Sequence, residues 1–183
     1  MLKKRLLFIA GSSGTGKTSV LLKTIEVLKA RGCSVGGMVS REVRAGGGRV
    51  GFEILDLSSG RRGWLAHVNQ KHGPRIGKYR VNLEDLDNIG AEAIVNAVEN
   101  ADVVAIDEIG PMELHSERFK EAVKKAVESR KLVIGTVHWK ERNRLIQAIN
   151  ARDAEIYKVT YENRGNLHEI IVEKAAEFLA RNN

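Results

Sequence analysis

Residues 11–18 read GSSGTGKT, which matches the pattern G-x-x-x-x-G-K-[ST] of loops that bind nucleotide phosphates. In such a loop, successive backbone N–H groups face the phosphate oxygens, and the following helix N-terminus adds partial positive charge. The sequence therefore predicts that Lys17 contacts the β- and γ-phosphates during bond cleavage, and that the Thr18 hydroxyl binds Mg²⁺. The residues predicted to contact the nucleotide here are Gly11, Ser12, Ser13, Gly14, Thr15, Gly16, Lys17 and Thr18.

A second chemical pattern is VVAIDEIG, in which four apolar residues precede the adjacent acids Asp107 and Glu108. Ligands of open α/β sheets gather at the carboxyl ends of buried strands, so Asp107 is predicted to share the Mg²⁺ ion with Thr18. Glu108 is predicted to orient or deprotonate the attacking water, although two acids can also simply end a strand. The predicted nucleotide-binding residues of this segment are Val103, Val104, Ala105, Ile106, Asp107, Glu108, Ile109 and Gly110.

Other polar residues could complete the site. In VIGTVH, Thr136 or His138 could contact the γ-phosphate or the water, but a histidine satisfied at a strand end is an equally good interpretation. Several arginines could stabilise the transferring charge, and the sequence gives no distances to choose among them: Arg41, Arg44, Arg142 and Arg164.

Alternating strands and helices are predicted to position these groups. Continuous apolar runs at residues 5–10, 101–107 and 131–138 are typical of parallel strands covered on both faces. Helices are predicted over Lys17 to Arg31, after Asn82, after Ser116 and near the C-terminus, with apolar positions at helical spacing. The stretch from Gly36 to about Trp64 contains short β-like runs joined by glycines, which predicts an antiparallel hairpin. The fold class expected is a three-layer α/β domain with a mainly parallel sheet.

Length and composition limit the possible classes of protein. The chain has 183 residues, which fits one domain over 1–183, and no apolar run is long enough to span a membrane. The apolar run after the N-terminal lysines leads into the glycine loop, so we interpret it as a strand and not a signal peptide. The single cysteine, Cys33, favours a reducing compartment, and we expect the cytoplasm. The basic residues that give the net charge of +7 are scattered among acidic residues, so nucleic acid is not the expected partner. A monomer is favoured.

Together these motifs resemble a known family. GSSGTGKT, SREVRAGGGRVGFEILDL, IGKYRVNLEDL, VVAIDEIGPMEL with SERF, and YENRGNL occur in order over roughly residues 5–175. They resemble the small nucleoside-triphosphatase (nucleotide phosphatase) family of thermophilic bacteria and archaea, which includes the human cancer-related nucleoside-triphosphatase.

This resemblance implies a RecA-like P-loop fold with an extra strand between the two nucleotide-motif strands. It also implies Mg²⁺-dependent hydrolysis of ATP, GTP and other nucleoside triphosphates to diphosphates, with Lys17 and Glu108 in the chemistry. Asn163 and Arg164, in the ENRG segment, would lie near the base or phosphates, and Arg164 ranks first among the arginines. Pro111 stands where a lysine is more usual in the family, so that lysine has no counterpart here.

Two other functions share the same loop. A small-molecule or nucleotide kinase would need a mobile lid with arginines, which the hairpin region could supply. A nucleotide-driven nucleic-acid-binding protein would need a basic surface interleaved with aromatic residues, and aromatics make up only 5% of the chain.

Overall fold

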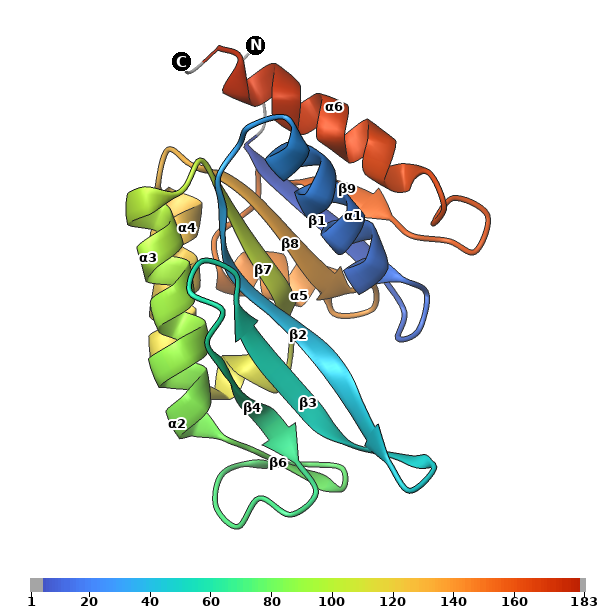
Figure 1. Cartoon of the computed structure of the whole chain (residues 1–183), viewed down its shortest axis with the longest axis vertical. Helices are drawn as coiled ribbons and strands as arrows, with labels where there is room; N and C mark the ends of the chain where they lie inside the picture. The colour runs from blue at the N-terminus through green and yellow to red at the C-terminus, as the bar shows by residue number, and fades with distance from the viewer. Residues whose placement is uncertain (1–4, 182–183) are drawn as a thin grey trace.

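A computed structural model describes residues 5–181, and Figure 1 shows one twisted sheet with helices on both faces. The described sheet has nine strands in the order β5-β6-β4-β3-β2-β7-β8-β1-β9. The strands are β1 (Leu6–Gly11), β2 (Val35–Ala45), β3 (Gly48–Asp56), β4 (Arg62–His67), β5 (Arg75–Ile76), β6 (Tyr79–Val81), β7 (Val103–Ile109), β8 (Leu132–His138) and β9 (Glu155–Lys158). The helices are α1 (Lys17–Ala30), α2 (Leu83–Asp85), the π-helix η1 (Leu86–Ala91), α3 (Glu92–Asn100), the 3-10 turn η2 (Glu113–His115), α4 (Glu117–Glu128), α5 (Arg142–Ala148) and α6 (Leu167–Leu179).

The half of the sheet that carries the motifs is parallel. Strands β2, β7, β8, β1 and β9 pair in parallel in that order. Strand β8 lies between β1, which leads into the glycine loop, and β7, which carries the paired acids. This is the extra strand between the two nucleotide-motif strands that the resemblance implied.

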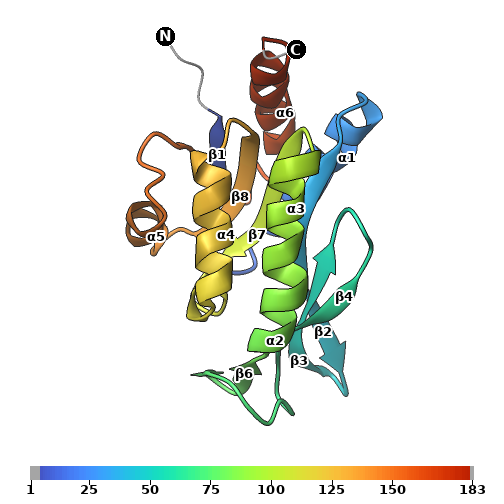
Figure 2. The ribbon, with the colours of Figure 1, turned by 90° about the vertical axis from the view of Figure 1, so that its left-hand side faces the viewer.

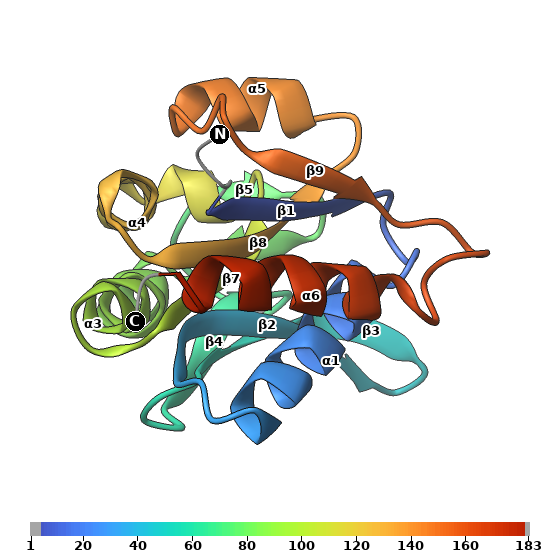
Figure 3. The ribbon, with the colours of Figure 1, turned by 90° about the horizontal axis from the view of Figure 1, so that it is seen from above.

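Side chains of the central strands alternate between two apolar cores. On β1, Leu6, Phe8 and Ala10 pack with α3, α4 and α5, whereas Leu7 and Ile9 pack with α1 and α6. Successive side chains of a strand point to opposite faces, so a fully apolar run buries both. Figure 2 shows α3 and α4 side by side on one face, and Figure 3 shows α1 and α6 together on the other. The predicted three-layer α/β architecture is confirmed.

The other half of the sheet is antiparallel. The first residues of β2 pair with β7, and β2 then runs on beyond β7 as the first arm of a hairpin with β3. Gly46 and Gly47 form the turn with positive φ angles of 58° and 78°, which explains the glycines there. The predicted hairpin over Gly36 to about Trp64 is confirmed, and β4, β5 and β6 extend it further.

Helix starts follow the predicted caps. The Asn82 side chain accepts a hydrogen bond from the Asp85 amide, and the Ser116 hydroxyl accepts one from the Phe119 amide. On the last helix, the apolar spacing in the sequence predicts that both Ile170 and Ile171 face the core, but Ile170 is 54% exposed and only Ile171 is buried. Among the described helices, none is long and apolar enough to cross a membrane.

Candidate active site

The glycine loop joins the end of β1 to the start of α1. A Cβ atom at Gly11 would lie 2.5 Å from the Thr15 hydroxyl oxygen, so the loop closes this tightly only with glycine there. Gly16 has φ 105° and forms the N-cap of α1, which directs the free amides of the first helical turn toward the loop. The sequence therefore folds here into a cradle of backbone N–H groups at a helix N-terminus, the arrangement that binds phosphate.

Lys17 folds back over this cradle. Its ammonium group donates hydrogen bonds to the carbonyl oxygens of Gly11, at 3.0 Å, and Ser12, at 3.3 Å. It also lies 3.6 Å from a carboxylate oxygen of Glu108. The lysine is buried, so its positive charge is concentrated where the phosphates of a bound nucleotide would lie.

Asp107 lies at the carboxyl end of β7 and is only 1% exposed. Its carboxylate accepts hydrogen bonds from the Thr18 hydroxyl at 3.0 Å and from the Thr136 hydroxyl at 2.6 Å. Burial raises the pKa of Asp107, while these two hydroxyls, the Ser40 backbone amide and the charge of Lys17 oppose the rise. The donor set is a carboxylate and a hydroxyl beside a phosphate cradle. It fits Mg²⁺, which usually takes one or two carboxylates plus substrate phosphates and water.

Glu108 follows where β7 departs from regular pairing. The pairing of β7 with β8 is irregular between Ile106 and Ile109, with one more residue on β7 than on its partner, and the Asp107–Glu108 peptide bond is cis. An extra residue in one strand of a pair re-aims the side chains beside it, and here Asp107 is buried while Glu108 keeps 27% of its side chain exposed beside Lys17. Burial raises the pKa of the Glu108 carboxyl, and the Lys17 charge lowers it. A carboxylate in this position can contact both solvent and a phosphate bound by Lys17.

A sequence model described as NTPase matches residues 6–172 of the chain. The chain belongs to this NTPase family. The nucleoside-triphosphatase THEP1 of Thermofilum pendens is 47% identical over 175 residues, covering 94% of this chain and 96% of the relative. THEP1 of Methanocaldococcus jannaschii is 41% identical over 168 residues, covering 92% and 95%. The chain is therefore a nucleoside-triphosphatase, and the resemblance seen in its motifs is confirmed.

Two solved structures show the same fold. The crystal structure of THEP1 from Aquifex aeolicus superposes with a TM-score of 0.79 at 28% identity, covering 91% of this chain and 96% of the other. The solution structure of a human cancer-related nucleoside triphosphatase gives a TM-score of 0.78 at 35% identity, covering 92% and 96%. The P-loop NTPase fold class is thus confirmed by structure as well as by sequence.

Two elements of this NTPase site were not predicted from the sequence. The Glu113 carboxyl, from the turn η2, is 4% exposed, and one of its oxygens lies 3.0 Å from the point where a Gly110 Cβ would be. An oxygen of Glu108 lies 3.0 Å from the same point, so the two carboxyl groups are neighbours. Burial, and then the charge of Glu108, raise the pKa of Glu113 well above its usual value. The other element is the Ser40 amide at Asp107, which only the pairing of β2 with β7 brings there.

The remaining polar residues that were predicted near the site have different partners in the structure. Thr136 is fully buried and directs its hydroxyl at Asp107, which places it behind the carboxylate. His138 accepts a hydrogen bond from the Lys140 amide at its Nδ1 atom. Arg142 stacks on Trp139, with its guanidinium carbon 3.5 Å from the ring centroid. Of these residues, only Thr136 touches the acids of β7 in a described hydrogen bond.

Asn163 and Arg164 lie in the turn between β9 and α6. The Asn163 side chain accepts a hydrogen bond from the Thr160 amide at 2.8 Å and donates one to the Lys158 carbonyl at 2.8 Å. The Arg164 side chain lies against the P-loop, with its Cδ atom 3.5 Å from the position of a Cβ at Gly16. The fold therefore brings Arg164 to the nucleotide loop, while Asn163 shapes the turn that carries it.

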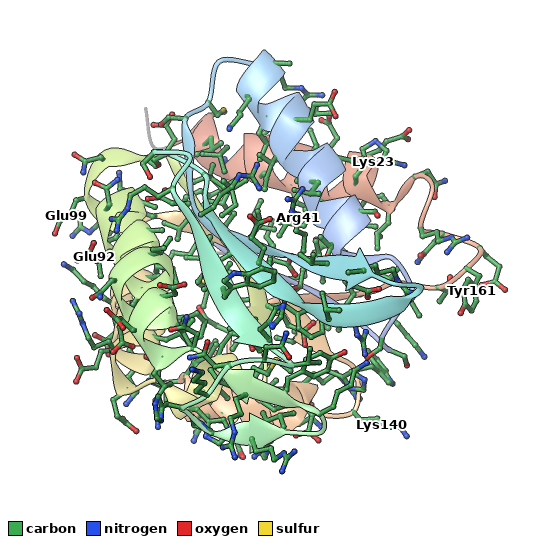
Figure 4. All side chains as sticks on the ribbon, turned by 60° about the horizontal axis from the view of Figure 1, so that its bottom comes forward. Lys23, Arg41, Glu92, Glu99, Lys140 and Tyr161 are labelled. Atoms are coloured by element: carbon green, nitrogen blue, oxygen red, sulfur yellow. The ribbon has the colours of Figure 1, made fainter. Side chains whose placement is uncertain are left out.

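Arg41 and Arg44 lie on β2 in the antiparallel half of the sheet. Arg41 pairs with Glu53, and Arg44 contacts Glu42 at 2.7 Å. Both arginine side chains are largely exposed. Figure 4 shows Arg41 among the strands of this extension and Lys23 on α1.

A hollow of about 590 Å³ lies elsewhere, on the face covered by α3 and α4. Its acids are matched by neighbouring bases, with Arg61 paired to Glu92 and Lys125 paired to Glu99. Figure 4 labels the two glutamates along α3, away from the glycine loop. The glycine loop, Asp107 and Glu108 thus lie at the carboxyl edge of the parallel strands and do not line this hollow.

Proposed function

We propose that this nucleoside-triphosphatase hydrolyses ATP, GTP and other nucleoside triphosphates to the diphosphate and phosphate with Mg²⁺ as cofactor. The observation that carries the proposal is the Lys17–Glu108 contact at 3.6 Å beside the Thr18–Asp107 contact at 3.0 Å. It joins a phosphate-binding cation, a carboxylate open to solvent and a set of Mg²⁺ donors in one place. Attack of water on the γ-phosphate of a nucleoside triphosphate uses all three together.

In the proposed reaction, backbone amides of the glycine loop bind the β- and γ-phosphates, and Lys17 turns from its carbonyl partners to contact their oxygens. Glu108 accepts a hydrogen bond from a water and holds it in line with the bond to be broken. As the water oxygen bonds to the γ-phosphorus, the bond to the bridging oxygen breaks, and Glu108 receives the water proton. The diphosphate leaves with its negative charge balanced by Lys17.

Asp107 and Thr18 are the residues that would hold Mg²⁺. When bound, the ion would neutralise charge on the β- and γ-phosphate oxygens. Thr136 would keep the Asp107 carboxylate in a fixed orientation, because its buried hydroxyl has that carboxylate as its partner. Loss of a residue that holds a metal ligand in place typically lowers metal affinity or activity about 10- to 100-fold.

Weak selectivity for the base is part of the proposal. The two strongest motifs, residues 11–18 and 103–110, both address phosphates and the cation. The hairpin region also favours hydrolysis over a kinase reaction, because it does not have the form of the mobile arginine-bearing lid that a kinase would need. Its arginines lie on strands of the continuous sheet and are paired with acids, as Arg62 is with Glu53 at 3.2 Å.

The test is phosphate release from a panel of nucleoside triphosphates, diphosphates and candidate acceptors, with and without Mg²⁺. Release from several triphosphates without an added acceptor, and loss of release after chelation, would support the proposal. Label transfer that requires an acceptor would instead indicate a kinase. Turnover that rises with DNA or RNA at low salt, and loses this rise at high salt, would indicate a nucleic-acid-driven enzyme.

A further inference from the structure

The order of the strands sets the direction in which a bound nucleotide lies. If the proposed function holds, the γ-phosphate faces Glu108 and Asp107 on β7. Strand β1, which leads into the cradle, is separated from β7 by β8, and it has β9 on its other side. The phosphate chain follows the loop and the first turn of α1, so the nucleoside end points away from β7. The segment that receives it is the one that follows β9.

That segment is fixed against the P-loop. The Val159 amide donates to the Ala10 carbonyl at 2.8 Å, which continues the pairing of β9 with β1 into the turn. Within the turn, the Arg164 amide donates to the Thr160 carbonyl at 3.1 Å. Thr160 and Asn163 also exchange hydrogen bonds between backbone and side chain, at 2.8 and 3.2 Å. Figure 3 shows this turn beside the glycine loop when the molecule is viewed from above.

An aromatic ring projects from this fixed turn. Tyr161 is 69% exposed, the most exposed of the large hydrophobic side chains in the part of the chain that the structure describes. The guanidinium carbon of Arg164 lies 5.1 Å from its ring centroid, and the Cδ atom of the same arginine lies 3.5 Å from the position of a Cβ at Gly16 of the loop. Figure 4 shows Tyr161 on the outer side of the turn. A planar ring and a planar cation thus stand together at the nucleoside end of the cradle.

A second aromatic ring near the loop, that of Trp139, is already covered. Trp139 has the Arg142 guanidinium 3.5 Å and the Lys158 ammonium 4.4 Å from its ring centroid. It follows β8, which lies on the γ-phosphate side of β1. Its position and its partners make it a poorer platform for a base than Tyr161.

We propose that Tyr161 and Arg164 form the nucleobase subsite of this enzyme, with the base stacking on the Tyr161 ring and the Arg164 guanidinium packing against the base or ribose. Aromatic stacking tolerates all bases, because every base has a π-face. Such a subsite strengthens nucleotide binding without selecting one base, as a triphosphatase that accepts several bases requires. It rests on the proposed function, since it assumes that a nucleoside triphosphate occupies the loop.

The experiment compares ligands with and without a base. Calorimetry with Mg²⁺ would measure binding of a non-hydrolysable ATP analogue, the corresponding UTP analogue and inorganic tripolyphosphate to the full chain. The variants are Tyr161→Ala, Tyr161→Phe and, as a matched control on exposed surface of the adjacent helix, Ile170→Ala. Thermal unfolding of each variant reports whether the fold is retained.

The expected result is a loss specific to ligands with a base. Tyr161→Ala should weaken binding of the ATP analogue about 5- to 150-fold, the range of one stacked base, and that of the smaller pyrimidine by less. Tripolyphosphate binding by Tyr161→Ala should stay within about twofold of the wild type, while Tyr161→Phe and Ile170→Ala should bind all three ligands as the wild type does. If the wild type binds tripolyphosphate too weakly to measure, the purine–pyrimidine difference decides alone.

Unchanged binding of the ATP analogue by Tyr161→Ala would overturn the subsite. So would an equal loss for both nucleotide analogues and tripolyphosphate, because that result would indicate damage to the phosphate cradle. Either outcome leaves the proposed hydrolysis standing if the wild type still releases phosphate. A wild type that releases no phosphate from any triphosphate would refute the proposed function itself.

Discussion

Replacing Glu108 with glutamine should lower the turnover rate but leave nucleotide binding as tight as before, or make it tighter. The substitution keeps the shape of the side chain and removes the group that is proposed to take the water proton. A positioned general base contributes about 10²- to 10⁴-fold to a rate, so kcat should fall by about that factor. Because burial raises the pKa of Glu108, the neutral amide should also be tolerated without loss of stability.

Binding should become equal or tighter in the same variant. At 3.6 Å from Glu108, the Lys17 ammonium is attracted to the carboxylate by about 4–5 kcal/mol at an effective dielectric constant of about 20. Solvation of the partly exposed carboxylate cancels most of this attraction. The attraction that remains opposes nucleotide binding, because Lys17 must leave Glu108 before it can contact phosphate. Glutamine also removes a negative charge from beside the triphosphate. In the presence of Mg²⁺, we expect the dissociation constant of the enzyme for a non-hydrolysable triphosphate to fall by up to about tenfold. That factor corresponds to about 1.4 kcal/mol of binding free energy.

The assay pairs single-turnover phosphate release with calorimetric binding for the wild type, Glu108→Gln and a control, Glu92→Gln. Glu92 is an exposed glutamate on α3, paired with Arg61 at 3.4 Å and far from the loop, so its variant should match the wild type in both measurements. A Glu108→Gln enzyme with turnover within tenfold of the wild type would refute the role of Glu108 as base. Binding weakened tenfold or more would refute the view that Glu108 competes with the phosphates for Lys17.

Three further changes test other parts of the structure. Burial keeps Glu113 protonated in the folded state above its ordinary pKa of 4.5, so the free energy of unfolding should fall as pH rises past that value. Glu113→Gln should remove this fall, and urea unfolding should find the variant more stable than the wild type near pH 8 but not near pH 4. Thr136→Val should retain the fold, seen by circular dichroism, yet lower kcat about 10- to 100-fold by freeing Asp107. Gly37→Ala should destabilise by about 3 kcal/mol or more in urea, because its Cβ would lie 2.0 Å from the Ala105 carbonyl oxygen at a φ of 110°; normal stability in that variant would contradict the close β2–β7 approach.

The sequence predicted the parts of the site that are encoded locally. Lys17 and Thr18 follow the loop because the G-x-x-x-x-G-K-[ST] spacing sets a turn and a helix start within eight residues. Asp107 and Glu108 were predictable because an uninterrupted apolar run must be a buried strand, and its polar end must then lie at the ligand edge of the sheet. In each case the functional residues are adjacent in the sequence to the loop or strand that positions them.

The parts that sequence missed depend on contacts between distant segments. Ser40 reaches Asp107 through a backbone amide, and no side-chain pattern signals which amide a strand pairing will expose. Glu113 reads as an ordinary acid before a helix, and only the fold of residues 110–113 buries it beside Glu108. Strand β9 is short, with partly exposed side chains at its edge, so it lacks the apolar run that identified its neighbour β1. Helix α5 has seven residues, too few for a helical period to stand out.

The charges of the site give a physical reason for the proposed dependence on Mg²⁺. Three carboxyl groups, from Asp107, Glu108 and Glu113, lie close together at this edge of the sheet, and the Lys17 ammonium lies 3.6 Å from Glu108. Burial keeps Glu113 neutral, which still leaves the two carboxylates of Asp107 and Glu108 beside the one charge of Lys17 before a nucleotide arrives. A triphosphate would add more negative charge to this low-dielectric edge, and backbone amides supply only partial positive charges. A divalent cation held by Asp107 and Thr18, as proposed, would restore the balance, so nucleotide and Mg²⁺ should bind with positive cooperativity, each tightening the binding of the other by the same factor. Titrating the triphosphate analogue at several Mg²⁺ concentrations measures that factor, and a value of one would contradict this electrostatic account.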